Sequence, residues 1–413
     1  MRESILQFGG GKFLRCFADL FVHELNAGRT AADLHGVIVI QSTAGTRAEQ
    51  LNRQQGRYHV AIRGLCGRRP TGSGEATSNT RRTAAPGHHI GQELPTCFAS
   101  PTAMPSPALG QAIDRIVEVA GIRRGLTAAG QWPDVLAAAR SPELELIVSN
   151  TTEAGFALTA GDAPDDAPPQ SFPAKLLAVL RERFRAGLSG VTILPCELLD
   201  RNAERLRDLA LQQAGLWSLP RDFLAWLREA CRWRSTLVDR IVSSPPPGDP
   251  LAAQDPLFAV AEPFALWLVE GADDVPVFNQ HPVVQRVARL EPYALRKVRI
   301  LNGAHTALVA KALPLGVATV RQAVADAAIG RWLRELLFDE IVPTLSGRVD
   351  QPEQFAADTL QRFANPYLEH RLADIALHHA TKLDTRLRPS YEEYCARFGR
   401  APPRLAEALG LPP

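Results

Sequence analysis

The sequence has few cysteines, and none of them forms a Cys-x-x-Cys pair. Six cysteines are spread over 413 residues. This distribution is typical of a reduced cytoplasmic protein and argues against a disulfide framework. His88 and His89 stand between Cys66 and Cys97 but lack the ligand spacing of a zinc finger. We therefore expect no metal site.

Long apolar runs and net charge are also missing. No apolar run reaches the roughly 20 residues that a membrane-spanning helix needs, and the opening MRESILQFGGGK lacks the apolar segment of a signal peptide. The formal net charge is +2 with both signs interspersed, whereas a nucleic-acid surface needs a concentrated basic patch. We expect a cytoplasmic monomer or small homo-oligomer that binds neither nucleic acid nor membrane.

What the chain does have is an alternation of short apolar runs and amphipathic segments. Residues 4–8 fit a short strand, and the apolar residues after it recur at helical spacing. The run GVIVIQS (36–42) is typical of a buried parallel strand. Further strands are expected at 58–65, 144–151 and 190–197. The strand–helix–strand order predicts a βαβ unit and a parallel sheet.

Two regions differ from this alternation. Residues 67–112 are rich in Gly, Ser, Thr, Pro and Arg without an apolar period, which is typical of a loop or a disordered insertion. From about Glu291 onward the chain is expected to be helix after helix. The predicted fold is therefore α/β, with a Rossmann-like domain over 1–285 that carries the insertion and a mostly α-helical domain over 286–413.

Three glycines, Gly9, Gly10 and Gly11, join the first strand to the amphipathic segment. A strand, a glycine turn and a helix in this order place backbone N–H groups against a phosphate. Gly9 and Gly11 match the first two glycines of G-x-G-x-x-G, but Leu14 takes the third position. Spacing alone leaves open a turn that only reverses the chain. A P-loop is excluded because no Ser or Thr follows Lys12.

If a dinucleotide binds at this loop, Lys12 and Arg15 are close enough in the sequence to contact its pyrophosphate. The second strand of such a fold usually ends in an acidic residue that binds the ribose of NAD. Gln41 takes that place here, and Arg47 follows where it could face the 2′-phosphate of NADP. The loop by itself leaves the choice between NAD and NADP open.

The segment RKVRILNGAHTAL contains Lys297, Asn302 and His305. At about 100° per residue the three side chains project into one arc of a helix. A lysine that exchanges the hydroxyl proton, with an amide and an imidazole that polarise the oxygen, suits alcohol oxidation. Burial and positive neighbours such as Arg296 and Arg299 would lower the pKa of the lysine. The pattern alone fits a solvated lysine and a core histidine at least as well.

Several motifs together resemble the polyol-specific long-chain dehydrogenase/reductase family, which includes mannitol dehydrogenases and hexuronate reductases. Its K-x4-N-x2-H signature fits Lys297, Asn302 and His305 without a gap. QFGGGKFLR resembles its N-terminal F-G-x-G-N-F-x-R loop. Motifs similar to its tagaturonate reductase branch are VSNTTEAGF, DDAPPQSFPAKL, LPCELLDRN, STLVDRIV and LNGAHTAL. The resemblance covers most of the chain outside 67–112.

The resemblance implies an NAD-linked interconversion of D-altronate and D-tagaturonate without a metal. Lys297 would be the general acid/base, Asn302 and His305 would polarise the reacting oxygen, and Asp239 would line the active site. The residues expected to bind the cofactor are Phe8, Gly9, Gly10, Gly11, Lys12, Phe13, Arg15, Gln41, Asn150, Thr152 and Glu153. The candidates for binding the substrate carboxylate are Arg362, Asn365, Lys382 and Arg386.

The chain departs from the family pattern at three places. Lys12 stands where the family usually has Asn, and Leu198 stands where mannitol dehydrogenases have a second asparagine. The chain ends at LAEALGLPP, where relatives continue with further helices, so we expect a shortened C-terminal domain. Three alternatives stay open: the same chemistry on fructuronate or mannitol, a non-catalytic nucleotide-binding relative, and an interaction protein without a cofactor.

Overall fold

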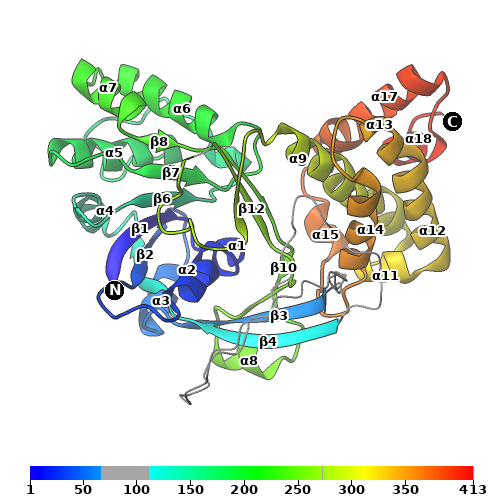
Figure 1. Cartoon of the computed structure of the whole chain (residues 1–413), viewed down its shortest axis with the longest axis horizontal. Coiled ribbons are helices and arrows are strands. Elements are labelled where there is room, and N and C mark those ends of the chain that lie inside the picture. The colour runs from blue at the N-terminus through cyan, green and yellow to red at the C-terminus, as the bar shows by residue number, and fades with distance from the viewer. Residues whose placement is uncertain (67–110, 272, 413) are drawn as a thin grey trace, which may run out of the picture.

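The computed structural model describes residues 1–66, 111–271 and 273–412. The insertion expected at 67–112 lies outside these residues except for its last two positions. Those two residues were expected to be loop, but they begin a strand, β4 (Gln111–Val119). In Figure 1 the N-terminal strands and their helices lie on the left, and the helices of the C-terminal part lie on the right.

The main sheet has six parallel strands in the order β5-β2-β1-β6-β7-β8. They are β1 (Arg2–Phe8), β2 (His35–Gln41), β5 (Ile122–Thr127), β6 (Leu146–Ser149), β7 (Thr192–Pro195) and β8 (Arg232–Trp233). This is the strand order of a dinucleotide-binding Rossmann sheet. In it, β2 and β5 lie on one side of β1, and the chain then crosses over to place β6, β7 and β8 on the other side. The predicted parallel sheet is confirmed.

Helices cover both faces of this sheet because its strands are apolar on both sides. Every residue of β2 is buried. Val37 and Val39 pack with Phe21 of α2 (Ala18–Asn26) on one face. Ile38 and Ile40 face the other side, toward a second cluster. The helices that contribute to that second cluster are α4 (Trp132–Ala139), α5 (Phe172–Arg185), α6 (Asn202–Leu216) and α7 (Arg221–Glu229).

The expected strand at 58–65 forms, but it does not join the main sheet. It is β3 (Tyr58–Cys66), which pairs antiparallel with β4 and parallel with β11 (Ala259–Ala261). The place beside β2 is taken by β5 instead. This second sheet also contains β10 (Val242–Ser243). In the chain, the short helix α8 (Pro250–Gln254) connects β10 to β11. A third sheet contains β9 (Thr236–Asp239), β12 (Leu266–Glu270) and β13 (Val284–Val287).

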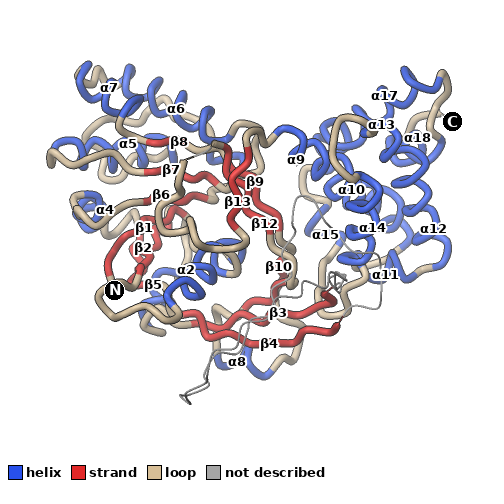
Figure 2. The backbone as a smooth tube through the Cα atoms, in the orientation of Figure 1, coloured by secondary structure: helices blue, strands red, loops and turns tan. Residues whose placement is uncertain are grey.

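From Glu291 to Leu409 every named element is a helix, as expected. Ala61 of β3 and Val260 of β11 pack into the core of these helices, so the second sheet joins the two parts of the chain. Figure 2 shows helices beside the strands on the left of the molecule and the helical region, without strands, on the right. None of the helices in the described ranges is long and apolar enough to cross a membrane.

The helical region has these elements: α9 (Glu291–Arg296), the π-helix η2 (Lys297–Asn302), α10 (Gly303–Ala312), η3 (Leu313–Leu315), α11 (Val320–Ala325), α12 (Ala327–Glu335), the π-helix η4 (Leu336–Ile341), α13 (Val342–Leu345), α14 (Pro352–Phe363), α15 (Leu372–Ile375), α16 (His379–Lys382), the π-helix η5 (Leu383–Leu387), α17 (Arg388–Phe398) and α18 (Pro403–Leu409). The domain boundary at 285/286 stays a prediction.

Candidate active site

The glycine loop lies where β1 ends, at the point between β2 and β6. Gly9 has φ +109°, and a Cβ placed on it would come 2.9 Å from the carbonyl oxygen of Asn150, which follows β6. Its N–H donates to the carbonyl oxygen of Ile40 at 3.0 Å. Only glycine avoids both the backbone strain and the clash. Phe8, just before it, is fully buried.

The backbone after Gly9 is open on one side. A Cβ placed on Gly11 would meet nothing within 4 Å. The amphipathic segment that follows was expected to be one helix, but it is two: α1 (Lys12–Arg15) ends before Phe17, and α2 begins at Ala18. The break lets the Phe17 ring pack against Trp267, with ring centroids 5.1 Å apart.

The two cations of this loop lie on different sides of it. Lys12 is exposed, and its Nζ donates to the Ser244 hydroxyl at 2.7 Å. Arg15 is buried, and its guanidinium donates to the carbonyl oxygens of Gly10 at 2.6 Å and Leu257 at 3.1 Å. Arg15 therefore holds the loop through the Gly10 carbonyl oxygen, and its contact with a phosphate stays a prediction. Phe13 stacks on Phe17 at 4.9 Å.

Gln41 does not have a free amide for a ribose. Its Nε2 donates to the carbonyl oxygens of Thr43 and Gly45 at 2.9 and 2.7 Å, and its Oε1 accepts from the Ala48 N–H at 2.8 Å. These bonds hold the turn between β2 and α3 (Arg47–Arg53). The contact of Gln41 with a cofactor stays a prediction.

The loop after β6 is held by a residue that sequence reasoning missed. Glu197 is buried and accepts from the Ser149 hydroxyl at 3.0 Å and from the N–H and hydroxyl of Thr151 at 2.8 and 3.1 Å. Burial raises the pKa of Glu197, and those bonds oppose the rise. Asn150 donates to the carbonyl oxygen of Cys196 at 2.8 Å. A lone glutamate after a strand gives no local signal of this role.

The remaining residues expected in this loop are near it in the chain. Thr152 is exposed and has φ +72°, and Glu153 begins the short helix η1 (Glu153–Gly155). The strand order, the crossover between β1 and β6 and the open backbone at Gly11 together fit a dinucleotide. Within the described ranges no group of three or more His, Cys, Asp or Glu could hold a metal ion, and His88 and His89 lie outside those ranges.

Lys297 is the first residue of the π-helix η2 and is 7% exposed. Its Nζ donates to the carbonyl oxygen of Val238 at 2.5 Å and lies 3.7 Å from Oδ1 of Asp239. Burial lowers the pKa of Lys297; the carboxylate of Asp239 opposes this, and Arg362 and Arg386 add to it. A lysine in this setting can exchange a proton closer to neutral pH than an exposed one.

The segment from Lys297 to Asn302 is not the α-helix on which the 100° spacing was based. It is a π-helix between α9 and α10, a feature often found at functional sites. Asn302 is half-buried, and its side chain makes no hydrogen bond to any residue within the described ranges, whereas its carbonyl oxygen accepts from Thr306 at 2.9 Å. The convergence of the three side chains on one reacting atom stays a prediction.

His305 is buried, and its Nε2 has no hydrogen-bond partner among the described residues. Its ring lies 4.2 Å from the ring of Phe363 and 4.7 Å, edge-on, from that of His370. Burial, followed by His370 and Arg362, holds the pKa of His305 well below its usual value. The imidazole is therefore neutral near pH 7. Sequence reasoning missed His370, which no motif singles out.

Asp239 belongs to a buried group of two carboxylates and one guanidinium. Arg362 donates to both oxygens of Asp239 at 3.0 and 3.1 Å and to both oxygens of Glu262 at 3.0 and 2.7 Å. Burial would raise the pKa of Asp239, but Arg362 and Lys297 lower it below its usual value. These two carboxylates take four of the five N–H groups of Arg362, and no bond from the second Nη1 hydrogen is seen among the described residues.

The other three candidates for the substrate carboxylate differ in their surroundings. Asn365 is buried, donates to the carbonyl oxygen of Arg63 at 2.9 Å and accepts from the Tyr367 N–H at 3.1 Å. Lys382 donates to the carbonyl oxygen of Ile375 at 2.8 Å. Arg386, in η5, is close enough for its charge to act on Lys297 and His305.

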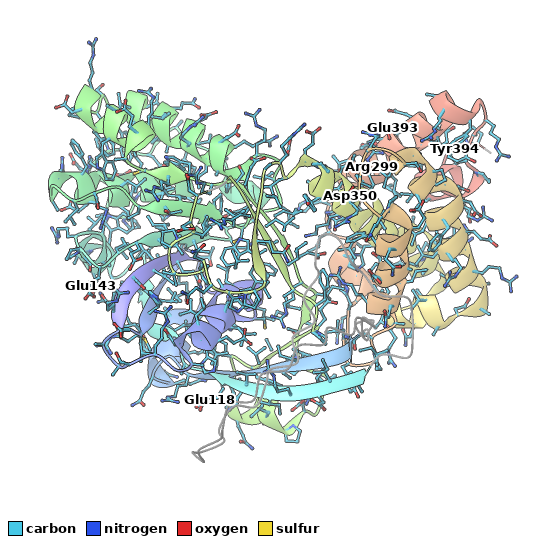
Figure 3. The ribbon with its side chains drawn as sticks, viewed as in Figure 1. Glu118, Glu143, Arg299, Asp350, Glu393 and Tyr394 are labelled. Atoms are coloured by element: carbon cyan, nitrogen blue, oxygen red, sulfur yellow. The ribbon has the colours of Figure 1, made fainter. Side chains whose placement is uncertain are left out.

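The arginines expected beside Lys297 point elsewhere. Arg299 donates to Ser390 at 2.9 Å and to Glu393 at 2.8 Å, and Figure 3 shows it next to Glu393 in the helical region. Arg296 donates to the carbonyl oxygen of Asp350 at 2.8 Å. The positive neighbours of Lys297 are Arg362 and Arg386 instead, because they come from helices that pack against η2.

Comparisons with known proteins agree with this architecture. Residues 110–280 match the family model described as the mannitol dehydrogenase Rossmann domain, and residues 289–411 match the mannitol dehydrogenase C-terminal domain. The altronate oxidoreductase of Klebsiella pneumoniae (strain 342) is 36% identical over 98% of this chain and 78% of its own length. That of Bacillus subtilis (strain 168) is 35% identical over 98% and 77%.

Solved structures share the fold at lower identity. The ternary complex of Pseudomonas fluorescens mannitol 2-dehydrogenase with NAD and D-mannitol superposes with a TM-score of 0.74 at 19% identity, covering 99% of this chain and 78% of that one. A substrate-free D-sorbitol dehydrogenase has a TM-score of 0.72 at 20% identity, covering 99% and 79%. The chain therefore belongs to the mannitol dehydrogenase family of oxidoreductases.

Proposed function

We propose that this chain is an NAD-dependent oxidoreductase that interconverts D-altronate and D-tagaturonate. Relatives that are 35–37% identical over nearly the whole chain are altronate oxidoreductases. The observation that carries the chemistry is the buried Lys297 beside Asp239, with a pKa lowered by burial. Residues 1–285 would hold the cofactor, and residues 286–413 would supply the lysine.

A bound nicotinamide supplies the acceptor or donor of hydride. In the oxidation, neutral Lys297 takes the proton of the substrate hydroxyl, and in the reduction it returns that proton. The Nε2 of His305 has no partner within the described ranges, so as an N–H donor it can hold the developing alkoxide or ketone oxygen. Asn302 adds an amide donor to the same oxygen.

The substrate carboxylate would bind to Arg386. A guanidinium can hold a carboxylate by two parallel hydrogen bonds, and the charge of Arg386 acts on both Lys297 and His305. Arg362 is a second candidate, although two buried carboxylates already take four of its N–H groups. Arg362 then serves mainly to fix Asp239 beside Lys297.

A substrate panel tests the proposal. D-altronate, D-mannitol and the sugar acid that yields fructuronate are each offered with NAD, and initial rates are compared. The proposal predicts the highest kcat/KM for D-altronate, and a preference for a neutral polyol rejects the sugar-acid assignment. Binding of NADH without turnover of any of the three would favour the non-catalytic alternative.

The variant Arg386→Met separates the carboxylate contact from general damage. It should lower kcat/KM for D-altronate by about tenfold or more, since a charge-assisted pair is lost. The residual rate on D-mannitol, which has no carboxylate, should stay the same. Equal losses on both substrates would remove Arg386 from the carboxylate site.

A further inference from the structure

A positively charged side chain lies over the glycine loop. Arg47 is the first residue of α3, and a Cβ placed on Gly10 would come 3.2 Å from its Cδ and 3.6 Å from its Cγ. The stem of Arg47 thus packs against the loop, while the residue as a whole is exposed. The guanidinium therefore sits at the exposed rim of the loop that would hold the dinucleotide.

No counter-charge faces this guanidinium in the described part of the chain. The structure gives Arg47 neither an ion pair nor a hydrogen bond there. Burial lowers the pKa of Arg47, and the charge of Arg15 lowers it further. Arg53 at the other end of the same helix behaves differently, because its guanidinium pairs with Glu49 at 2.6 Å. Arg47 is positioned to receive an anion.

The turn before Arg47 carries no acid that would exclude a 2′-phosphate. An acidic residue after the second strand binds the ribose hydroxyls of NAD, whereas an arginine there accommodates the 2′-phosphate of NADP. β2 ends in Gln41, whose amide is used within the turn, and residues 42–46 are Ser-Thr-Ala-Gly-Thr. Repulsion by a carboxylate is therefore absent from this turn.

We infer that Arg47 binds the 2′-phosphate of NADP(H), so that the chain accepts NADP(H) as well as NAD(H). This inference rests on the proposed dinucleotide site but not on the identity of the sugar. The phosphate is a dianion or monoanion that accepts two parallel hydrogen bonds from a guanidinium. The stem, fixed against Gly10, reduces the entropy that Arg47 loses when it forms these bonds.

The test uses two fragments that differ only in the 2′-phosphate. Binding of 5′-ADP and of 2′,5′-ADP to the full chain is measured by calorimetry, so no turnover is needed. We expect the wild type to bind 2′,5′-ADP about tenfold more tightly, the size of one charge-assisted contact. Arg47→Met keeps an apolar stem over Gly10 and should remove this advantage while leaving 5′-ADP binding within about twofold.

Arg53→Met is the matched control, since it removes an exposed arginine from the same helix and should change neither affinity. Arg47→Lys keeps a charge and should restore part of the preference. Thermal unfolding of each variant shows that the fold is intact. If the wild type binds both fragments equally, or if Arg47→Met keeps the preference, the inference is wrong while the dinucleotide site stands. If neither fragment binds, both are wrong.

Discussion

The Nζ of Lys297 lies 3.7 Å from Oδ1 of Asp239, and both side chains are buried. The carboxylate raises the pKa of the lysine, while burial, Arg362 and Arg386 lower it. The proton affinity of Lys297 is therefore the balance between one neighbouring carboxylate and a buried, positively charged setting.

Asp239→Asn should shift this balance in a known direction. The substitution removes the charge that raises the pKa of Lys297, so the lysine loses its proton at lower pH. In the pH profile of kcat/KM for alcohol oxidation, the rising limb should therefore shift to lower pH by about 1 unit. The pH–rate profiles of the two proteins check this. A limb that stays in place, or moves to higher pH, would show that Asp239 does not set the proton affinity of the base.

Arg362→Met should destabilise the fold. It leaves the Asp239 and Glu262 carboxylates buried without their shared guanidinium, which should cost about 3–5 kcal/mol of unfolding free energy. The loss should be smaller at acidic pH, where the carboxyls can protonate. The matched control is Arg371→Met, because Arg371 forms an ion pair with Glu369 at the surface. Urea denaturation measures the loss of unfolding free energy in both variants. The control should change stability by less than about 1 kcal/mol, and equal losses in both variants would contradict the account.

Asp19→Asn should stabilise the fold above neutral pH. Asp19 is buried, its Oδ1 has no partner among the described residues, and burial raises its pKa from 3.8 to about 7. The folded state thus holds a proton that the unfolded state has released, so wild-type stability falls as pH rises through this window. Asparagine carries no charge, so the unfolding free energy of Asp19→Asn should exceed that of wild type by an amount that grows with pH to at most about 4 kcal/mol.

Urea denaturation of wild type and Asp19→Asn at pH 5 and pH 8 measures this advantage. A constant difference between the two proteins across that range would mean that Asp19 has an ordinary pKa in the fold.

The sequence predicted the elements that have a local signal. The β-branched run at 36–42 is β2, and the glycines after β1 lie at the crossover of the main sheet. The partner of β3 could not be predicted in this way, because its apolar pattern suits either sheet. Strand pairing depends on which neighbour occupies the place beside β2, and that is a property of the whole fold.

The buried charges show the same limit at the candidate site. Lys297, Asp239, Arg362 and Arg386 were each expected at the site from the family resemblance. Their mutual contacts were not predicted, because the last three residues lie on three other elements. Glu197 and His370 each look like ordinary polar residues in the sequence. Their roles depend on contacts formed only when distant segments pack, and periodicity carries no information about those contacts.

The most direct test of the central claim is turnover by Lys297→Met with NAD and D-altronate, together with its affinity for NADH. Since general acid–base catalysis typically contributes 10²–10⁴-fold, turnover should fall by about 10³-fold. The dissociation constant for NADH should stay within about threefold of wild type, because the glycine loop is untouched. Turnover close to wild type would contradict the assignment of Lys297 as the group that moves the proton.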